Sequence, residues 1–268
     1  MTMPLIDAVL VEPSARGHVV VKKVEAPSPR AGEALIRVHA TSLNRGEIRQ
    51  ASQGVAGRRI GWDFAGVVER AADDVPGPRV GARVVGMLRT GAWAELIAAP
   101  VEALAVLPDG VDFTRAATLP VAGLTALYGL DRAHGLLGRT VLITGGTGGV
   151  GNFGIQLARL GGARVVSTVR RQEQSQLVRD AGAHVVLVGE NPAELRAEGP
   201  FDHILDGVGG APLGAALASL AKNGTAVLYG VTGGAEIPFD ARSFYGTGGT
   251  SIQGFILFHE LGQTPAGL

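Results

Sequence analysis

The segment from Thr140 to Gly162 limits the possible folds of this 268-residue chain more than any other. It reads TVLITGGTGGVGNFGIQLARLGG: a short apolar run, a G-x-G-x-x-G turn from Gly146 to Gly151, and a stretch with helical spacing of apolar residues. This order predicts a buried strand over 140–144, a tight turn and then a helix. In that context the turn is typical of dinucleotide binding; the alternative is a flexible turn in a chain with 41 glycines.

The glycine positions within this turn fit contact with a pyrophosphate. Gly146 permits the tight turn, Gly148 lets the backbone approach the phosphates, and Gly151 lets the helix pack closely on the strand. The first N–H groups of the helix have no partner within it, and its dipole adds a positive end, so anions are favoured there. We therefore expect a dinucleotide to contact the turn formed by Gly146, Thr147, Gly148, Gly149, Val150 and Gly151.

The end of the next predicted strand indicates which dinucleotide is preferred. About twenty residues after the first glycine, an NAD site usually places an acidic residue for the ribose 2′-hydroxyl. This chain has Ser167, Thr168, Arg170 and Arg171 there, and no acidic residue before Glu173. Two guanidinium groups beside a hydroxyl suit a 2′-phosphate, because arginine offers a planar fork of donors. We therefore expect NADPH, with ordinary solvated arginines as the alternative.

Two different periodicities divide the chain. Over residues 5–107, short strand-like segments alternate with glycine and proline, which favours a mainly antiparallel barrel or sandwich. A helix is expected over Thr114–Leu119, with Thr114 as its N-cap and Pro120 after its end. From Gly123 onward, continuous apolar strands alternate with helices, which indicates a doubly wound parallel sheet. The expected elements of this second half include helices over 123–137 and 211–224 and strands over 225–231 and 250–258.

Composition excludes several classes of protein. Lysine plus arginine and aspartate plus glutamate both number 24, so the basic excess of a nucleic-acid binder is missing. The chain has no cysteine, which removes disulfides, thiolate nucleophiles and thiolate metal sites. No apolar run approaches the roughly 20 residues needed to span a bilayer, and the first residues lack the pattern of a secretory signal. We expect a cytoplasmic protein that binds neither nucleic acid nor membrane.

Motifs along most of the chain resemble one family in content and order. The sequence is similar to the medium-chain dehydrogenase/reductase superfamily, in particular its zinc-independent quinone oxidoreductases and enoyl reductases. The resemblance implies a GroES-like, mainly β catalytic domain over 1–120, a Rossmann domain over 121–256, and an active site in the cleft between them. The matching segments are ATSLN (40–44), GWDFAGVV (61–68), GARVVGM (81–87), GAWAE (91–95), LPDG (107–110), ATLPVAGLTALYGL (117–130), TGGTGGVG (144–151), FDHILDGVGG (201–210) and GTAVLYGV (224–231).

The sequence departs from the zinc-dependent members of this superfamily. Where those enzymes place a cysteine ligand, this chain reads Ser42-Leu43-Asn44, and their Gly-His-Glu reads Gly61-Trp62-Asp63. No cysteine-rich structural loop is present in the sequence. The resemblance therefore implies an enzyme without a metal. A further departure is that relatives continue for several dozen residues past this chain's end, so we expect 257–268 to begin an incomplete segment that returns to the catalytic domain.

Without a metal to polarise an alcohol, the expected chemistry is hydride delivery from NADPH to an electrophilic acceptor, a quinone or an α,β-unsaturated carbonyl. Asn44 matches an asparagine that lies near the nicotinamide in related quinone reductases, and it is the expected catalytic residue; a turn residue is the alternative. Trp62 replaces a lost metal ligand and is expected either to line the acceptor pocket or to pack in the barrel. Tyr128, Tyr229, Tyr245 and solvent remain open as proton donors.

Four further residues are expected at the cofactor. Thr125 lies where the family approaches the nicotinamide, although a threonine there also suits a helix cap. Val208, Gly230 and Val231 follow strand ends at the edge where parallel sheets bind ligands.

Two other functions remain open, namely an enoyl-thioester reductase of polyketide or fatty-acid type and an NADPH-binding protein without turnover. The family often pairs Rossmann sheets edge to edge, so we expect a homodimer through Ser251–Phe258.

Overall fold

The computed structural model describes residues 4–189 and 191–262, so the expected C-terminal segment lies partly outside the described residues. The described chain folds into two compact units. One unit runs to Val121 and also takes in Gly262, and the other covers Ala122–Leu261. None of the helices within the described residues is long and apolar enough to cross a membrane.

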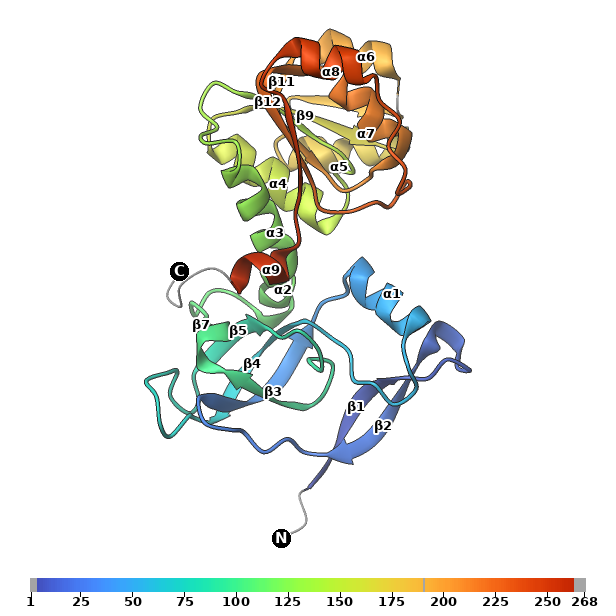
Figure 1. Ribbon diagram of the computed structural model, residues 1–268. Helices are drawn as coiled ribbons and strands as arrows, with labels where there is room; N and C mark the ends of the chain where they lie inside the picture. Colours follow the sequence, from blue (N-terminus) through green and yellow to red (C-terminus); the bar gives the residue numbers. More distant parts are fainter. Residues whose placement is uncertain (1–3, 190, 263–268) are drawn as a thin grey trace. The chain divides into compact units, whose positions relative to one another are not determined.

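The first unit is built mainly from antiparallel strands. Its five-stranded sheet has the order β6-β3-β4-β5-β7, and β1 and β2 form a separate two-stranded sheet (Figure 1). Alternating apolar residues of the larger sheet, among them Ile36, Phe64 and Val84, have no exposed surface and form its core. The elements are β1 (Leu5–Val11), β2 (Val19–Glu25), β3 (Glu33–Thr41), α1 (Arg45–Gln53), β4 (Asp63–Arg70), β5 (Arg83–Met87), β6 (Leu96–Pro100), β7 (Leu104–Val106) and α2 (Phe113–Ala117).

The helix expected at Thr114–Leu119 begins one residue earlier than the sequence indicated. Asp112 caps α2, because its Oδ1 accepts a hydrogen bond of 2.8 Å from the Arg115 backbone N–H. The prediction of Thr114 as the N-cap was therefore wrong. An aspartate accepts such a bond at least as well as a threonine, so both residues offered a start signal. Pro120 opens the next helix, α3 (Pro120–Asp131), where its missing N–H costs no hydrogen bond.

The second unit is a doubly wound α/β structure, as predicted. Its six parallel strands have the order β10-β9-β8-β11-β12-β13, and the direction of the strand order reverses between β8 and β11. Ligands of such sheets bind beyond the carboxyl ends of the strands at this reversal. The elements after α3 are β8 (Thr140–Ile143), α4 (Gly149–Leu160), β9 (Arg164–Val169), α5 (Ser175–Asp180), β10 (Val185–Val188), α6 (Pro192–Glu198), β11 (Phe201–Asp206), α7 (Gly210–Leu217), β12 (Leu220–Leu228), α8 (Ala241–Thr247), β13 (Ser251–Gly254) and α9 (Leu257–Leu261).

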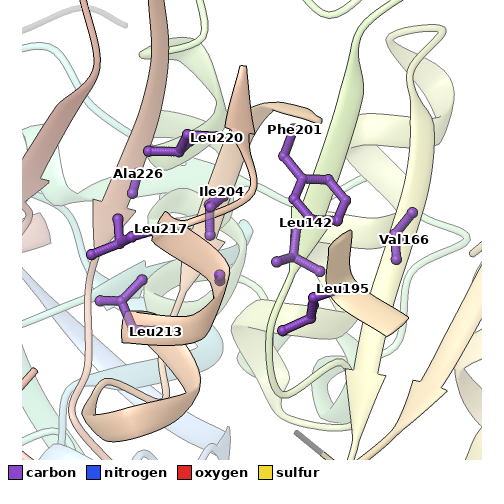
Figure 2. Close-up of a cluster of buried hydrophobic side chains, with 10 residues drawn as sticks. Leu142, Val166, Leu195, Phe201, Ile204, Leu213, Leu217, Leu220 and Ala226 are labelled. Carbon is purple, nitrogen blue, oxygen red and sulfur yellow. The ribbon is translucent and has the colours of Figure 1, made fainter. Parts of the chain in front are cut away.

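A cluster of apolar side chains fixes one face of this sheet. Leu142 of β8, Ile204 of β11 and Ala226 of β12 are fully buried, and Leu213 of α7 packs with them (Figure 2). Phe201 is also fully buried in the cluster. Such continuous burial explains why these strands read as uninterrupted apolar runs in the sequence.

Several expected elements have different bounds or a different type. The helix predicted over 123–137 is α3, which ends at Asp131, and the strand predicted over 225–231 is part of β12, which ends at Leu228. The helix predicted over 211–224 ends at Leu217 as α7, and β12 begins at Leu220, where it pairs with Phe201 of β11. The short run LASLA carries no periodicity that separates a strand from a helix, so pairing with β11 decides. The strand predicted over 250–258 is correct only for Ser251–Gly254, because α9 starts at Leu257.

His203 gives the second unit a testable sensitivity to acid. It lies in β11 with no exposed surface, and burial lowers the pKa of its imidazole to about 4. The folded protein therefore holds His203 neutral, whereas the unfolded chain binds the proton near pH 6.5. This contribution to stability is complete above that pH and is lost as the pH falls from 6.5 towards 4.

We expect His203→Leu to reduce the loss of stability between pH 7 and pH 5 by about 2 kcal/mol, measured by denaturant unfolding at each pH. The control is Ile204→Val, a change to a buried residue of the same strand that carries no titratable group; it should leave the difference between the two pH values unchanged. If His203→Leu lost as much stability between pH 7 and pH 5 as the wild type, His203 would not titrate as described.

Candidate functional site

The glycine-rich turn lies at the carboxyl end of β8, beside the point where the strand order reverses. Gly145 has a φ of +62°, a left-handed conformation that favours glycine. The Gly146 N–H donates to the carbonyl of Thr168 at 3.0 Å, and the Gly148 N–H donates to that of Gly145 at 2.9 Å. Gly148 is then the N-cap of α4. The positive φ of the tight turn is thus at Gly145, one residue before the position expected from the motif.

The three motif glycines are required for different reasons. A Cβ on Gly146 would lie 2.3 Å from Ser167 Oγ, and one on Gly151 would lie 2.4 Å from the carbonyl oxygen of Gly145. Packing within the protein therefore excludes side chains at both positions. A Cβ on Gly148 would meet only the Gly145 oxygen, at 3.3 Å, and Gly148 is exposed. A ligand can therefore approach the Gly148 backbone from solvent, and a side chain there would have a single tight contact within the protein. Thr147, Gly149 and Val150 complete the turn into α4.

The residues at the end of β9 separate into two pairs. The Ser167 hydroxyl is buried and donates to the Ile143 carbonyl at 2.8 Å, and Thr168 Oγ1 accepts from the Gly145 N–H at 3.3 Å. Both hydroxyls therefore hold the backbone of the glycine-rich turn through hydrogen bonds to Ile143 and Gly145. Arg170 and Arg171 are exposed, and Arg171 Nε lies 3.5 Å from Glu173 Oε1. The arginines follow β9 directly and can meet an anion from solvent.

A buried carboxylate joins the turn to the loop after β11. Asp206 is fully buried; its Oδ1 accepts from the Thr144 hydroxyl at 2.6 Å, and its Oδ2 accepts from the Gly209 N–H at 2.7 Å. Thr144 Oγ1 in turn accepts from the Gly207 N–H at 3.2 Å. Burial raises the pKa of Asp206, and these hydrogen bonds oppose that rise.

Of the other residues expected at the cofactor, Val208, Gly230 and Val231 follow the ends of β11 and β12, whereas Thr125 lies within α3. Val208 Cγ2 is 3.5 Å from the place that a Cβ on Gly145 would take, so the loop after β11 packs on the turn. Gly230 and Val231 follow β12, and Val231 is 42% exposed. Thr125 is nearly buried in the second turn of α3, so it does not cap that helix.

The three tyrosines lie in different surroundings. The Tyr229 ring lies over Gly207, and burial raises the pKa of its hydroxyl far above the usual range. Tyr245 is 69% exposed, and Tyr128 is partly buried in α3.

Asn44 in the first unit begins α1 and is held by two buried carboxylates. Its Nδ2 donates to Asp63 Oδ2 at 2.6 Å and to Glu47 Oε2 at 3.1 Å, and its backbone N–H donates to Glu47 Oε2 at 2.6 Å. Both carboxylates are fully buried, so Nδ2 must face them while the amide oxygen faces away. Asn44 therefore caps a helix, and both hydrogens of its amide are committed to protein acceptors.

These two carboxylates accept hydrogen bonds from further donors. Asp63 Oδ2 also accepts from the Ser42 hydroxyl, and its Oδ1 accepts from the Val121 N–H at 2.8 Å. Glu47 Oε1 accepts from the Trp62 N–H at 2.5 Å. Burial raises the pKa of both carboxyl groups, and the hydrogen bonds oppose this. The Trp62 ring covers Gly46, where a Cβ would lie 2.2 Å from Cη2, so this side chain packs against α1.

Sequence reasoning did not assign Glu47, Thr144 or Asp206. The Asn44-to-Glu47 spacing is the N-cap and N3 spacing of a helix start, which is a usable signal. Thr144 and Asp206 each end a predicted strand, but their hydrogen bond depends on β8 and β11 being neighbours. No group of three or more histidine, cysteine, aspartate or glutamate side chains suited to a metal ion was found among residues 4–189 and 191–262.

Comparison with known proteins gives consistent matches for both units. Residues 30–109 match the alcohol dehydrogenase GroES-like domain, and residues 149–266 match the zinc-binding dehydrogenase family. The structure of a mycobacterial quinone oxidoreductase is 32% identical, covers 95% of this chain and 82% of its own, and has a TM-score of 0.84. A mycobacterial structure complexed with NADPH is also 32% identical, with coverages of 94% and 82% and a TM-score of 0.85.

Larger proteins match as well. A mycocerosic acid synthase-like polyketide synthase of Mycobacterium tuberculosis is 37% identical over 160 residues, which is 58% of this chain and 8% of the synthase. The chain spans about a tenth of the length of the large synthases that it matches. With both domain families matched in order and a structural relative of 32% identity covered over 82% of its length, the chain belongs to the medium-chain dehydrogenase/reductase superfamily of oxidoreductases.

Proposed function

We propose that this protein is an NADPH-dependent, zinc-independent oxidoreductase that transfers hydride to a quinone or an α,β-unsaturated carbonyl. The observation that carries the proposal is the turn at the end of β8, where Gly148 is exposed, together with the two exposed arginines that follow the neighbouring strand β9. The similar mycobacterial structures, one of a quinone oxidoreductase and one complexed with NADPH, support the same cofactor and acceptor class.

The described residues fit a bound NADPH. The backbone N–H groups that open α4, from Gly149 onward, would meet the pyrophosphate, because they lack partners within the helix. Arg170 and Arg171 would hold the 2′-phosphate through charge-assisted hydrogen bonds. Val208, Gly230 and Val231 follow β11 and β12 at the same edge of the sheet and would contact the nicotinamide half. Ser167 and Thr168 act indirectly, because their hydroxyls hold the turn.

The chemistry of the donor set supports a reaction without zinc. Zinc in this superfamily would need deprotonated ligands with free lone pairs, and catalytic zinc sites use three protein ligands. In this chain, Asp63 and Glu47 each accept hydrogen bonds on both oxygens, and Trp62 stands where the zinc enzymes have histidine. A metal would therefore compete with hydrogen bonds that stabilise these buried carboxylates.

NADPH supplies the hydride, so the protein has to orient the acceptor and accommodate developing negative charge on its oxygen. Asn44 and the loop before it would orient the acceptor. Because both hydrogens of Nδ2 point to Asp63 and Glu47, this amide is not the donor to that oxygen. The donor and the final proton would then come from solvent or from another group.

One alternative acceptor has specific support. The chain matches part of several polyketide synthases, which favours an enoyl thioester as the substrate of a related reaction. A protein that binds NADPH without turnover is the second alternative. Steady-state oxidation of NADPH against quinones, enones and enoyl thioesters, with NADH as the control, separates the three. Turnover of quinones or enones supports the proposal, turnover of thioesters alone supports the first alternative, and tight binding without turnover supports the second.

Gly148→Ala tests the approach of a ligand to the turn. Gly148 has a φ of −75°, so alanine fits the backbone, and its methyl group would meet only the Gly145 oxygen. We expect a change in unfolding free energy within about 1 kcal/mol and at least tenfold weaker NADPH binding by fluorescence titration. Gly151→Ala is the contrasting variant and should destabilise the fold. Normal NADPH affinity in Gly148→Ala would contradict contact at this position.

Replacement of Arg170 and Arg171 together by alanine tests the preference for NADPH. Loss of two charge-assisted contacts to the 2′-phosphate should weaken NADPH binding about a hundredfold and leave NADH binding within threefold. Both dissociation constants are measured by calorimetry, with the exposed Arg179→Ala as the control. Equal losses for the two cofactors would remove the assignment.

A homodimer through β13 is part of the proposal. Within the described chain, β13 pairs on one side only, with β12, and Ile252 and Ile256 are 37% and 55% exposed. We expect a dimer by light scattering and a shift to monomer in Ile252→Lys. The control is Leu137→Lys, which changes a side chain that is 86% exposed and lies outside β13, and this variant should stay dimeric. A wild-type monomer at all concentrations would contradict the dimer.

A further inference from the structure

The network of Thr144 and Asp206 lies under the two loops that the proposed function assigns to different halves of the cofactor. Thr144 directly follows β8 and precedes the glycine-rich turn, and Asp206 is the last residue of β11, two residues before Val208. Their side chains are joined by the 2.6 Å hydrogen bond, and both are almost fully buried. The chemistry proposed above gives neither residue a part.

The direction of each hydrogen bond in this network is fixed by the groups present. Backbone N–H groups of Gly207 and Gly209 can only donate, so Thr144 Oγ1 accepts from the first and Asp206 Oδ2 from the second. The hydroxyl hydrogen of Thr144 is then free for Asp206 Oδ1, which as a carboxylate can only accept. Every donor finds an acceptor, and the network has a single arrangement.

The contacts around the network reach both loops. On the β8 side, Thr144 precedes Gly145, whose positive φ sets the path of the turn. On the β11 side, Val208 packs against Gly145, and its carbonyl accepts from the Gly233 N–H at 2.7 Å. The network therefore fixes the spacing between the turn and the Val208 loop.

From this arrangement we infer that Thr144 and Asp206 are positioning residues. They hold the glycine-rich turn and the loop after β11, which contains Val208, at the spacing that one bound dinucleotide requires. This inference rests on the proposed function. The 2′-phosphate site at Arg170 and Arg171 follows β9 and lies outside the network. Disruption of the network should therefore weaken a whole dinucleotide and spare a fragment that reaches only the arginines.

The test compares Thr144→Val with the wild type for two ligands, NADPH and adenosine 2′-monophosphate. Valine keeps the shape of threonine and removes both hydrogen bonds of the hydroxyl. We expect about tenfold weaker NADPH binding by calorimetry and adenosine 2′-monophosphate affinity within twofold by NMR titration. Thr144→Ser should restore NADPH binding, because serine keeps the hydroxyl.

A second variant and a control complete the design. Asp206→Asn should show the same selective loss: its amide oxygen is needed by Gly209, which leaves an amide donor facing Thr144. The control is Thr225→Val, which removes a threonine hydroxyl paired with Ser251 between β12 and β13, at 3.0 Å, and should change neither affinity. Equal weakening of both ligands in Thr144→Val and Asp206→Asn, or no weakening of either, would overturn the inference. Failure of the folded wild type to bind NADPH would instead refute the proposed function.

Discussion

The hydrogen bond between Thr144 and Asp206 joins two neighbouring strands at the point where the order of the parallel sheet reverses. A buried carboxylate is costly, and at Asp206 hydroxyl and backbone N–H donors offset the cost. The same bond places the glycine-rich turn and the loop after β11 side by side. The geometry of the glycine-rich turn thus depends on the side chains of Thr144 and Asp206 as well as on its own glycines.

A comparable arrangement organises the first unit. Asp63 and Glu47 are buried, and their oxygens accept hydrogen bonds from Ser42, Asn44, Trp62 and Val121. These carboxylates therefore fix a loop and the start of α1. In both units, buried carboxylates that accept hydrogen bonds on both oxygens hold a loop to which the proposed function assigns a role.

Much of the fold could be predicted from the sequence, because apolar strands, helix spacing and the glycine motif agree with one another. The turn from Gly146 to Gly151 was located correctly, although the positive φ falls on Gly145. The errors have local causes: LASLA is too short to show a period, and Asp112 and Thr114 compete as caps. The Thr144–Asp206 pair could not be predicted, because residues 62 positions apart meet only through the order of strands in the sheet.

The most direct test of the account is to follow deuterium from C4 of the nicotinamide of labelled NADPH into an enone product, in EDTA-treated protein, by mass spectrometry. Direct hydride transfer without zinc predicts deuterium at the β-carbon of the product, at a rate that EDTA does not change. Product that carries deuterium only when the solvent is D₂O, or turnover that stops after metal removal, would contradict direct hydride transfer without zinc.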